Sequence, residues 1–204
     1  MRHWLGYASD AYLNFLLSQL HPEKDELILD NGCGNGRFSI ALRQKGARVV
    51  ALDVNLSLLK KGAVKAKEEM LDSKIEFILA DMQSLPFKVG IFEKILCVHN
   101  LWYVPRYKTA VREMFRTLKK NGEMVVDHLN FLNLHVLLAW VQYVASRIGR
   151  RSPTPVFYRN PYEILRPFAF SRTSVFSLFT RQSRLYAMKG INPFASRLVV
   201  KCLK

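Results

Sequence analysis

Short apolar runs alternate with amphipathic segments along most of the chain. The apolar runs fall at 26–31, 48–53, 75–80, 92–98 and 122–128. Between them, apolar residues recur at helical spacing over 36–45, 56–71 and 106–119. This alternation is typical of βα units that build a parallel sheet. Two later strand-like runs, near 173–179 and 197–203, predict a terminal antiparallel pair, so the predicted fold class is α/β.

Helical patterns also occur outside this alternation. Residues 1–20 carry apolar side chains at helical spacing, interrupted by Asp10 and Asn14, which predicts an amphipathic helix and not a signal peptide. Residues 131–146 form a broad apolar helix, which at ~1.5 Å per residue is too short for the ~30 Å hydrocarbon core of a membrane. Two interpretations stay open for it: a core or lid helix, or a helix on a membrane surface. A short helix is expected at 161–167.

The chain is expected to form one domain over 1–204, in which 129–160 is an insertion, or lid, that faces the substrate. No internal repeat is visible. The three cysteines are widely spaced and odd in number, which favours reduced thiols in a cytoplasmic protein over a disulfide framework. Their spacing does not suggest a metal site.

The chain is strongly basic, with a net charge of +15, and the charge is uneven. Residues 1–128 hold 19 Lys and Arg against 15 Asp and Glu, whereas 129–204 hold 12 against one. One interpretation is a solvated surface that aids solubility. The other is a surface for an anionic partner: an acidic or phosphorylated substrate, RNA, or the headgroup layer of a membrane at whose periphery the protein lies.

The motif that most strongly indicates a ligand site is ELILDNGCGNGRFS at 26–39, where an apolar strand turns sharply into a helix. Glycine suits such a turn because it tolerates positive φ and lets a ligand approach the backbone. The spacing is G-x-G-x-G, with Arg37 where a dinucleotide site would have its third glycine. This argues against NAD or FAD, and no GK[ST] follows that would indicate a phosphate-binding P-loop.

Acidic residues end the next two predicted strands. Asp53 is placed to accept hydrogen bonds from the vicinal hydroxyls of a ribose, although it could also cap the helix that follows. Asp81 is placed to accept from an adenine amino group, while the backbone N–H of Met82 meets a ring nitrogen. The sequence therefore predicts an adenosine-containing ligand.

The ordered motifs LDNGCGNG, ALDVN, ADMQSLPF, FEKILCVHNLWYVP and TLKKNGEMVV resemble the class I S-adenosylmethionine-dependent methyltransferase family. The resemblance covers about 26–128. It implies a doubly wound, Rossmann-like, mostly parallel sheet of seven strands with the last strand antiparallel. It also implies that Asp30 and the loop hold the methionine portion, that Asp53 binds the ribose, and that Asp81 and Met82 bind the adenine. The expected cofactor-binding residues are Asp30, Gly32, Cys33, Gly34, Gly36, Asp53, Val54, Asp81, Met82 and Val98.

The chain departs from the family pattern at several positions. Glu93 replaces the usual Asp of the fourth strand, and Lys94 falls where the strand should be buried, so it is expected to snorkel or face an edge. Trp102-Tyr103 stands where many relatives carry paired histidines. The Asn/Asp-Pro-Pro-aromatic motif of enzymes that methylate exocyclic amino groups on nucleic-acid bases is absent, which counts against an adenine-N6 or glutamine-type methyltransferase.

Methyl transfer is an in-line displacement for which the cofactor supplies the activated methyl group, so a catalytic base is optional. The candidate bases are His99, His128 and His135, with His99 the first choice because it ends a strand at the ligand side. The leading hypothesis is methylation of a small or lipid-like, anionic acceptor. The alternatives are an RNA (tRNA) methyltransferase that uses the basic C-terminal part, and a non-catalytic S-adenosylmethionine-binding module.

Overall fold

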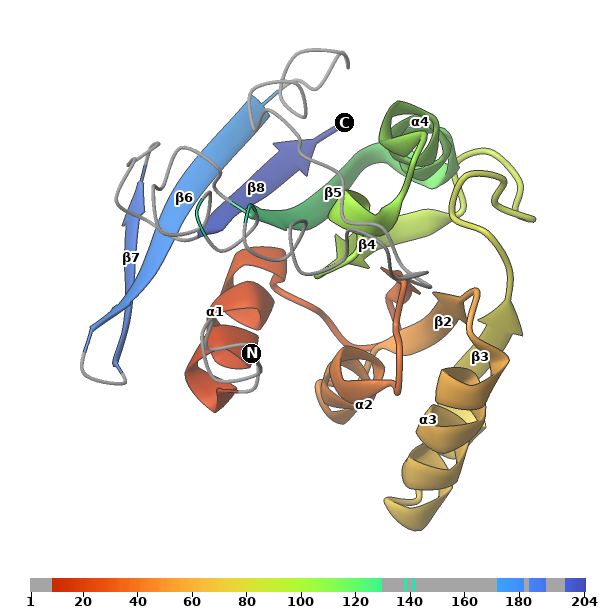
Figure 1. The fold of residues 1–204 in the computed structure, drawn as a ribbon. Coiled ribbons are helices and arrows are strands. Elements are labelled where there is room, and N and C mark those ends of the chain that lie inside the picture. The colour runs from red at the N-terminus through yellow and green to blue at the C-terminus, as the bar shows by residue number, and fades with distance from the viewer. Residues whose placement is uncertain (1–8, 130–137, 139–140, 142–171, 182–183, 190–196) are drawn as a thin grey trace.

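The computed structural model describes residues 9–129, 138, 141, 172–181, 184–189 and 197–204 (Figure 1). Within them, eight strands form one sheet: β1 Leu27–Asn31, β2 Arg48–Asp53, β3 Ile75–Leu79, β4 Phe92–Cys97, β5 Leu118–Leu129, β6 Arg172–Arg181, β7 Arg184–Lys189 and β8 Arg197–Leu203. The helices described are α1 Asp10–Leu20, α2 Arg37–Gln44, α3 Leu56–Glu68 and α4 Tyr107–Thr117, with short 3₁₀ turns η1 Asp72–Lys74 and η2 Leu101–Tyr103.

The strand order is β3-β2-β1-β4-β5-β8-β6-β7. Neighbouring strands from β3 through β5 are parallel, whereas β8 runs antiparallel to both β5 and β6. The α/β class, the mostly parallel sheet and the antiparallel last strand are therefore confirmed. The described sheet has one strand more than the seven expected, because the chain forms a hairpin after β6 and adds β7 at the edge.

Helices cover both faces of the sheet. In Figure 1, α1, α2 and α3 lie on one side and α4 lies on the other. Two buried clusters fill the spaces between sheet and helices: Leu16 of α1 and Leu42 of α2 belong to the first, and Met114 of α4 belongs to the second. Alternate residues of the central strands supply the sheet side of each cluster, as expected for strands buried on both faces.

The strand order reverses direction between β1 and β4. From β1 the chain continues outward to β2 and β3, and from β4 it continues the opposite way to β5. The loops that follow β1 and β4 therefore diverge at this point. Open α/β sheets bind ligands at such a switch point, outside the carboxyl ends of the strands.

At the opposite end of the sheet, the ammonium group of Lys94 lies beside residues that precede β1. The Lys94 side chain is buried, and β4 is a central strand, so the residue does not face a sheet edge. Its Nζ donates to Glu26 Oε2 at 2.7 Å and to the His21 carbonyl at 2.5 Å. The charge is tolerated because it is paired and hydrogen-bonded.

The end of α4 also differs from expectation. The helix stops at Thr117 and not at 119, and β5 begins at Leu118 and not at 122. Asn121 has a φ of 62°, and the pairing of β4 with β5 shifts register between Phe92 and Lys94. This irregularity explains why the sequence pattern predicts the strand only from residue 122 onward.

Most of the predicted helix at 131–146, of the insertion at 129–160 and of the short helix at 161–167 lies outside the described residues. Leu138 and Val141 are described, as helical residues with about half of each side chain exposed. Among the helices that the structure describes, none combines the length and the apolar character needed to cross a membrane.

Candidate active site

The glycine loop joins β1 to α2 at the switch point. Gly32 and Gly34 have φ values of 85° and 55°, which L-residues with side chains rarely adopt. A Cβ on Gly32 would overlap the side-chain amide of Asn100, whereas a Cβ on Gly34 would meet nothing within 4 Å. Gly36 precedes α2 and packs against Phe77. The loop is thus tightly held at Gly32 and open at Gly34, where a ligand can approach the backbone.

Asn100 ties the loop after β4 to the loop after β1. Its Nδ2 donates to the Gly32 carbonyl at 2.7 Å and to the Val98 carbonyl at 2.5 Å. The amide therefore fixes the spacing of the two loops that flank the switch point. Sequence reasoning missed this residue, because an asparagine after a strand has many uses and its partner Gly32 is far away along the chain.

Asp53 lies at the carboxyl end of β2, beside the glycine loop. Its Oδ2 accepts from the Gly34 N–H and its Oδ1 accepts from the Asn55 N–H, both at 2.8 Å. The cap of α3 is Asn55, whose side chain accepts from the first-turn N–H groups of Ser57 and Leu58. The carboxylate of Asp53 is therefore directed toward the loop and does not cap the helix. Val54, next to it, is largely exposed.

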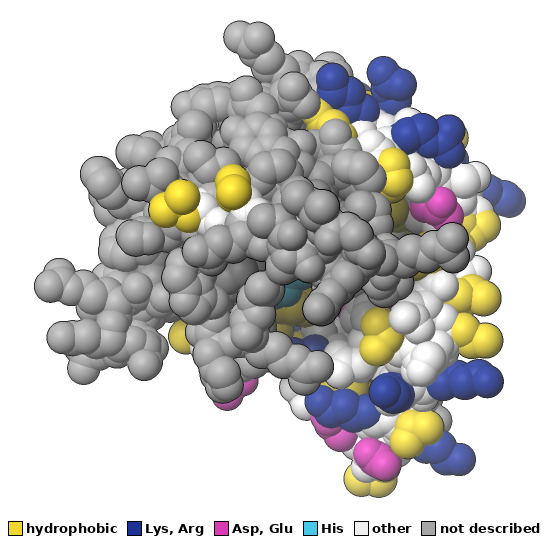
Figure 2. Space-filling view, in the orientation of Figure 1, with side chains coloured by type: hydrophobic (Ala, Val, Ile, Leu, Met, Phe, Trp, Pro, Cys, Tyr) yellow, Lys and Arg dark blue, Asp and Glu magenta, His cyan; other side chains and the backbone are white. Residues whose placement is uncertain are grey.

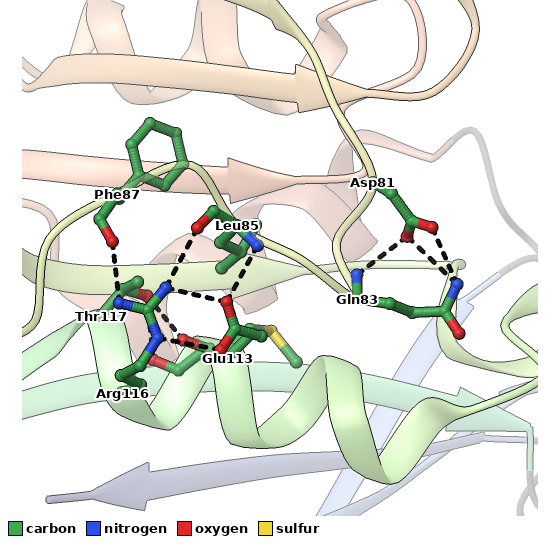
Figure 3. A network of polar contacts seen from close by, with 8 residues as sticks. Asp81, Gln83, Leu85, Phe87, Glu113, Arg116 and Thr117 are labelled. Atoms are coloured by element: carbon green, nitrogen blue, oxygen red, sulfur yellow. Dashed lines mark hydrogen bonds and ion pairs between the residues drawn. The ribbon is translucent and has the colours of Figure 1, made fainter.

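Asp81 follows β3 on the same edge of the sheet, and Figure 3 shows its carboxylate facing Gln83. It accepts from the Gln83 backbone N–H at 2.8 Å and from the Gln83 side-chain amide at 3.0 and 3.2 Å. The Asp81 side chain is exposed, while the Met82 side chain is buried. A ligand amino group could take the place of the Gln83 amide on this carboxylate.

Two charged residues of α4 hold the loop that carries Asp81 (Figure 3). Glu113 Oε2 accepts from the Leu85 N–H at 2.9 Å, and Arg116 donates to the carbonyls of Phe87 and Leu85 at 2.8 and 3.0 Å. The Arg116 guanidinium also donates to Glu113 and holds the pKa of that carboxyl below its usual range. These residues were not predicted, because a Glu-Arg pair three positions apart on a helix is also common on exposed surfaces.

Asp30 lies one residue before the end of β1 and is 2% exposed. Ser39 Oγ of α2 donates to its Oδ2 at 2.5 Å. Burial raises the pKa of the Asp30 carboxyl to about 7 from an ordinary value of 3.8, because a charge is poorly solvated there. Burial likewise raises the pKa of the neighbouring Cys33 thiol, which stays protonated at neutral pH. Asp30 is the titratable group of the loop region whose charge changes near physiological pH.

His99 follows β4 and lies against a buried carboxylate. Its backbone N–H donates to Asp127 Oδ1 at 2.6 Å, and its Nε2 is 3.2 Å from Asp127 Oδ2. Asp127 is fully buried near the end of β5. The hydroxyl of Tyr12, from α1, also donates to Asp127, and the Tyr12 ring stacks on the His99 ring at 5.4 Å between centroids. Neither Asp127 nor Tyr12 was predicted as a site residue.

The other two candidate bases are placed differently. His128 is 1% exposed and packs edge-on against Trp102 at 6.0 Å. As the neighbour of Asp127 in β5, it points to the opposite face of the sheet. His135 lies outside the described residues. Val98, the last predicted cofactor residue, is buried directly after β4.

The described residues fit the parts of S-adenosylmethionine. The open backbone at Gly34 can receive an extended ligand, and the acidic residues Asp53 and Asp81 follow adjacent strands along one edge. Carboxylates in these positions suit ribose hydroxyls and an adenine amino group. The structure thus joins Asp53 to the glycine loop and places Asp81 after the neighbouring strand, on the same edge of the sheet.

Comparison with known proteins agrees with this geometry. A family model described as a methyltransferase domain matches residues 29–126. A ubiquinone/menaquinone biosynthesis C-methyltransferase, UbiE, of Rhizobium johnstonii is 28% identical over 132 residues, which are 62% of this chain and 51% of that protein. An uncharacterised protein of Methanocaldococcus jannaschii is 34% identical over 58% of this chain and 47% of its own length. The chain spans about half the length of these curated relatives.

Solved structures share the fold at low sequence identity. The YcgJ protein of Bacillus subtilis superposes with a TM-score of 0.70 at 15% identity, covering 94% of this chain and 97% of that chain. A geranyl diphosphate methyltransferase in complex with S-adenosylmethionine gives a TM-score of 0.66 at 18% identity, covering 95% and 83%. The family match over residues 29–126, the ordered motifs and the sheet topology thus make this part of the chain similar to the methyltransferase domain of S-adenosylmethionine-dependent enzymes.

Proposed function

We propose that this protein transfers the methyl group of S-adenosylmethionine to a small or lipid-like, anionic acceptor. The observation that supports the proposal is the hydrogen bond between Asp53 and the Gly34 N–H, which puts the carboxylate proposed to bind the ribose beside the open part of the glycine loop. When bound, the cofactor supplies the activated methyl group. The residues of the chain then align the methyl donor with the acceptor, which can lower the activation barrier of the transfer by up to ~7–11 kcal/mol.

Each part of the cofactor has a proposed partner. Asp30 and the Gly32–Gly36 loop, Cys33 included, would hold the methionine portion. Asp53 would bind the ribose hydroxyls, with Val54 against the sugar and base. Asp81 would accept from the adenine amino group, and the Met82 N–H would meet a ring nitrogen. Val98 would line the site below His99, at the end of β4.

The acceptor is inferred from charge and from the relatives. Figure 2 shows Lys and Arg side chains on the right of the view, over α4 and α3, with apolar side chains among them. The exposed basic residues on these two helices are Lys60, Lys61, Lys65, Lys67, Lys108 and Arg112. The relatives' name, which refers to C-methylation in ubiquinone/menaquinone biosynthesis, supports a small molecule over RNA. The insertion at 129–160, with its arginines and broad apolar pattern, is the proposed cover of the acceptor.

The acceptor proposal predicts binding to anionic vesicles that persists at moderate salt. Charge attraction alone is screened beyond ~8 Å at physiological salt, so apolar insertion must contribute. Flotation with neutral vesicles, anionic vesicles and RNA measures this directly. The pair Arg150→Glu/Arg151→Glu, in the proposed cover, should reduce anionic-vesicle binding more than Lys60→Glu/Lys61→Glu, which makes the same charge change on the basic surface of α3 and should have a smaller effect.

Two outcomes of the same experiment contradict the lipid-like acceptor. Binding to RNA with a steep salt dependence would favour an RNA methyltransferase. Binding to neither partner would leave a soluble acceptor and a basic surface that only aids solubility. Absence of S-adenosylhomocysteine formation with every acceptor tested would favour a non-catalytic cofactor-binding module.

A further inference from the structure

We propose that Asp127 is a positioning residue that holds His99 as a proton acceptor, so the methyl acceptor is a molecule with an ionisable hydroxyl group. The proposal rests on the methyltransferase function proposed above and narrows its substrate class. It is carried by three residues from distant parts of the chain: Tyr12 on α1, His99 after β4 and Asp127 on β5.

The Asp127 carboxylate is placed as a buried anchor. It is fully buried and accepts hydrogen bonds from the Tyr12 hydroxyl and from the His99 backbone N–H, the latter at 2.6 Å. Its Oδ2 also lies 3.2 Å from His99 Nε2. A buried carboxylate needs such partners, because burial without them costs several kcal/mol (on the order of 2–7 for a neutral polar group and more for a charge). The carboxylate therefore holds the backbone of His99 by a hydrogen bond and places its negative charge 3.2 Å from the buried Nε2 of the ring.

The backbone of His99 is in an unusual conformation. Its φ is 62°, in the left-handed region that costs a residue with a Cβ roughly 1–2 kcal/mol. The hydrogen bond from its N–H to Asp127 offsets this cost. Backbone strain of this kind is found at functional sites, where the surrounding structure fixes the direction of a side chain. We expect the same of His99.

Aromatic rings restrict the imidazole on two sides. Tyr12 stacks on it with an interplanar angle of 7°, and the Trp102 ring lies at 5.8 Å with a tilt of 39°. The titratable groups that face His99 among the described residues include Tyr12 from α1 and Asp127 from β5. Because Nε2 is buried next to Asp127 and cannot reach an acceptor, the proton exchange is assigned to Nδ1.

The chemistry that uses this arrangement is removal of a proton during methyl transfer. The proton of the acceptor hydroxyl moves to Nδ1 of His99, while an electron pair of the acceptor oxygen forms the new bond to the methyl carbon. The carbon–sulfur bond breaks, its electron pair stays on sulfur, and the imidazolium later returns the proton to water. Asp127 stabilises the imidazolium. A neutral amine attacks with its own lone pair and needs no such base, so the arrangement favours a phenol or enol acceptor.

The test that needs no acceptor is an NMR titration of the His99 ring in ¹⁵N-histidine-labelled protein. Asp127→Asn should lower the pKa of His99 by about 1–3 units, because the opposite charge that favours the imidazolium is removed. Tyr12→Phe should not lower it, because the carboxylate charge remains. Glu123→Gln is the matched control: it makes the same charge change on β5, at a residue paired with Lys201, and should leave His99 unchanged. An unchanged titration in Asp127→Asn, or a shift of the same size in the control, would overturn the proposal.

The substrate class is tested with a series of phenols and matched anilines. The wild-type protein should methylate phenols in preference to anilines, and Asp127→Asn should lose at least about 100-fold in that rate, the size of a general-base contribution. Its affinity for S-adenosylhomocysteine should stay within about twofold of wild type. A preference for anilines, or no turnover of phenols, would overturn the hydroxyl assignment. Failure of the wild-type protein to bind S-adenosylhomocysteine would instead overturn the proposed function.

Discussion

The cofactor-free protein should lose about 4 kcal/mol of stability through Asp30 as the pH rises from about 4 to above 7. Burial raises the pKa of this carboxyl to about 7 in the folded state, whereas it returns to about 3.8 on unfolding. Between these values the folded protein keeps a proton that the unfolded chain has released. The stabilisation is therefore present below the lower pKa and is lost as the pH rises through the higher one.

Urea denaturation of wild type and Asp30→Asn at several pH values isolates this effect. Asparagine keeps an acceptor for the Ser39 hydroxyl but has no charge to bury. From about pH 4 to above pH 7, the free energy of unfolding of the variant should therefore rise by about 4 kcal/mol relative to that of wild type. Titrations elsewhere affect both proteins equally. Saturating S-adenosylhomocysteine should shrink the wild-type loss, since its ammonium group would favour the Asp30 carboxylate. Parallel stability profiles for the two proteins would contradict the burial of an acidic group at this position.

Gly32→Ala should destabilise the protein by about 3 kcal/mol, from overpacking together with left-handed backbone strain. The new Cβ would overlap the Asn100 amide, which is itself held by the Gly32 and Val98 carbonyls. Gly90→Ala is the matched control, because Gly90 has a similar positive φ of 65° and no atom nearer than 4.0 Å to an added Cβ. It should cost only about 1 kcal/mol.

A double-mutant cycle with Asn100→Ala identifies the cause. Removing the amide makes room for the methyl group, so Gly32→Ala should cost less in the Asn100→Ala background than in wild type. Chemical denaturation provides the four free energies of unfolding. Two results would contradict this explanation for the glycine at position 32. One is an equal loss of stability in Gly32→Ala and Gly90→Ala. The other is a double variant whose loss of stability equals the sum of the losses in Gly32→Ala and Asn100→Ala.

The sheet was predictable because its strands carry continuous apolar runs. The run at 48–53 coincides with β2, and the helix expected at 36–45 is found at 37–44. Buried parallel strands produce this signal locally, without information from the rest of the chain. The short strand β7 was missed, because RLYAMK has charged residues at both ends and only a few apolar positions between them.

The position of the candidate cofactor residues at one edge of the sheet was predictable for a similar reason. The glycine spacing and the acidic residues after β2 and β3 are local patterns, and the parallel topology brings them to one edge of the sheet. The His99 side was only partly predictable. Tyr12 and Asp127 are 115 residues apart, and their contact exists only because α1 packs across β5. In the sequence, Tyr12 belongs to the apolar stripe of a helix, and Asp127 is an unremarked polar residue near the end of a strand.

Calorimetric titration with S-adenosylhomocysteine and with NAD tests the cofactor assignment most directly. Wild type should bind S-adenosylhomocysteine saturably and should not bind NAD. Asp53→Asn should weaken binding by about 1–3 kcal/mol, through loss of charge-assisted hydrogen bonds to the ribose, while its melting temperature stays close to that of wild type. Saturable binding of NAD without a response to S-adenosylhomocysteine, or unchanged affinity in Asp53→Asn with a collapsed melting temperature, would contradict the site described above.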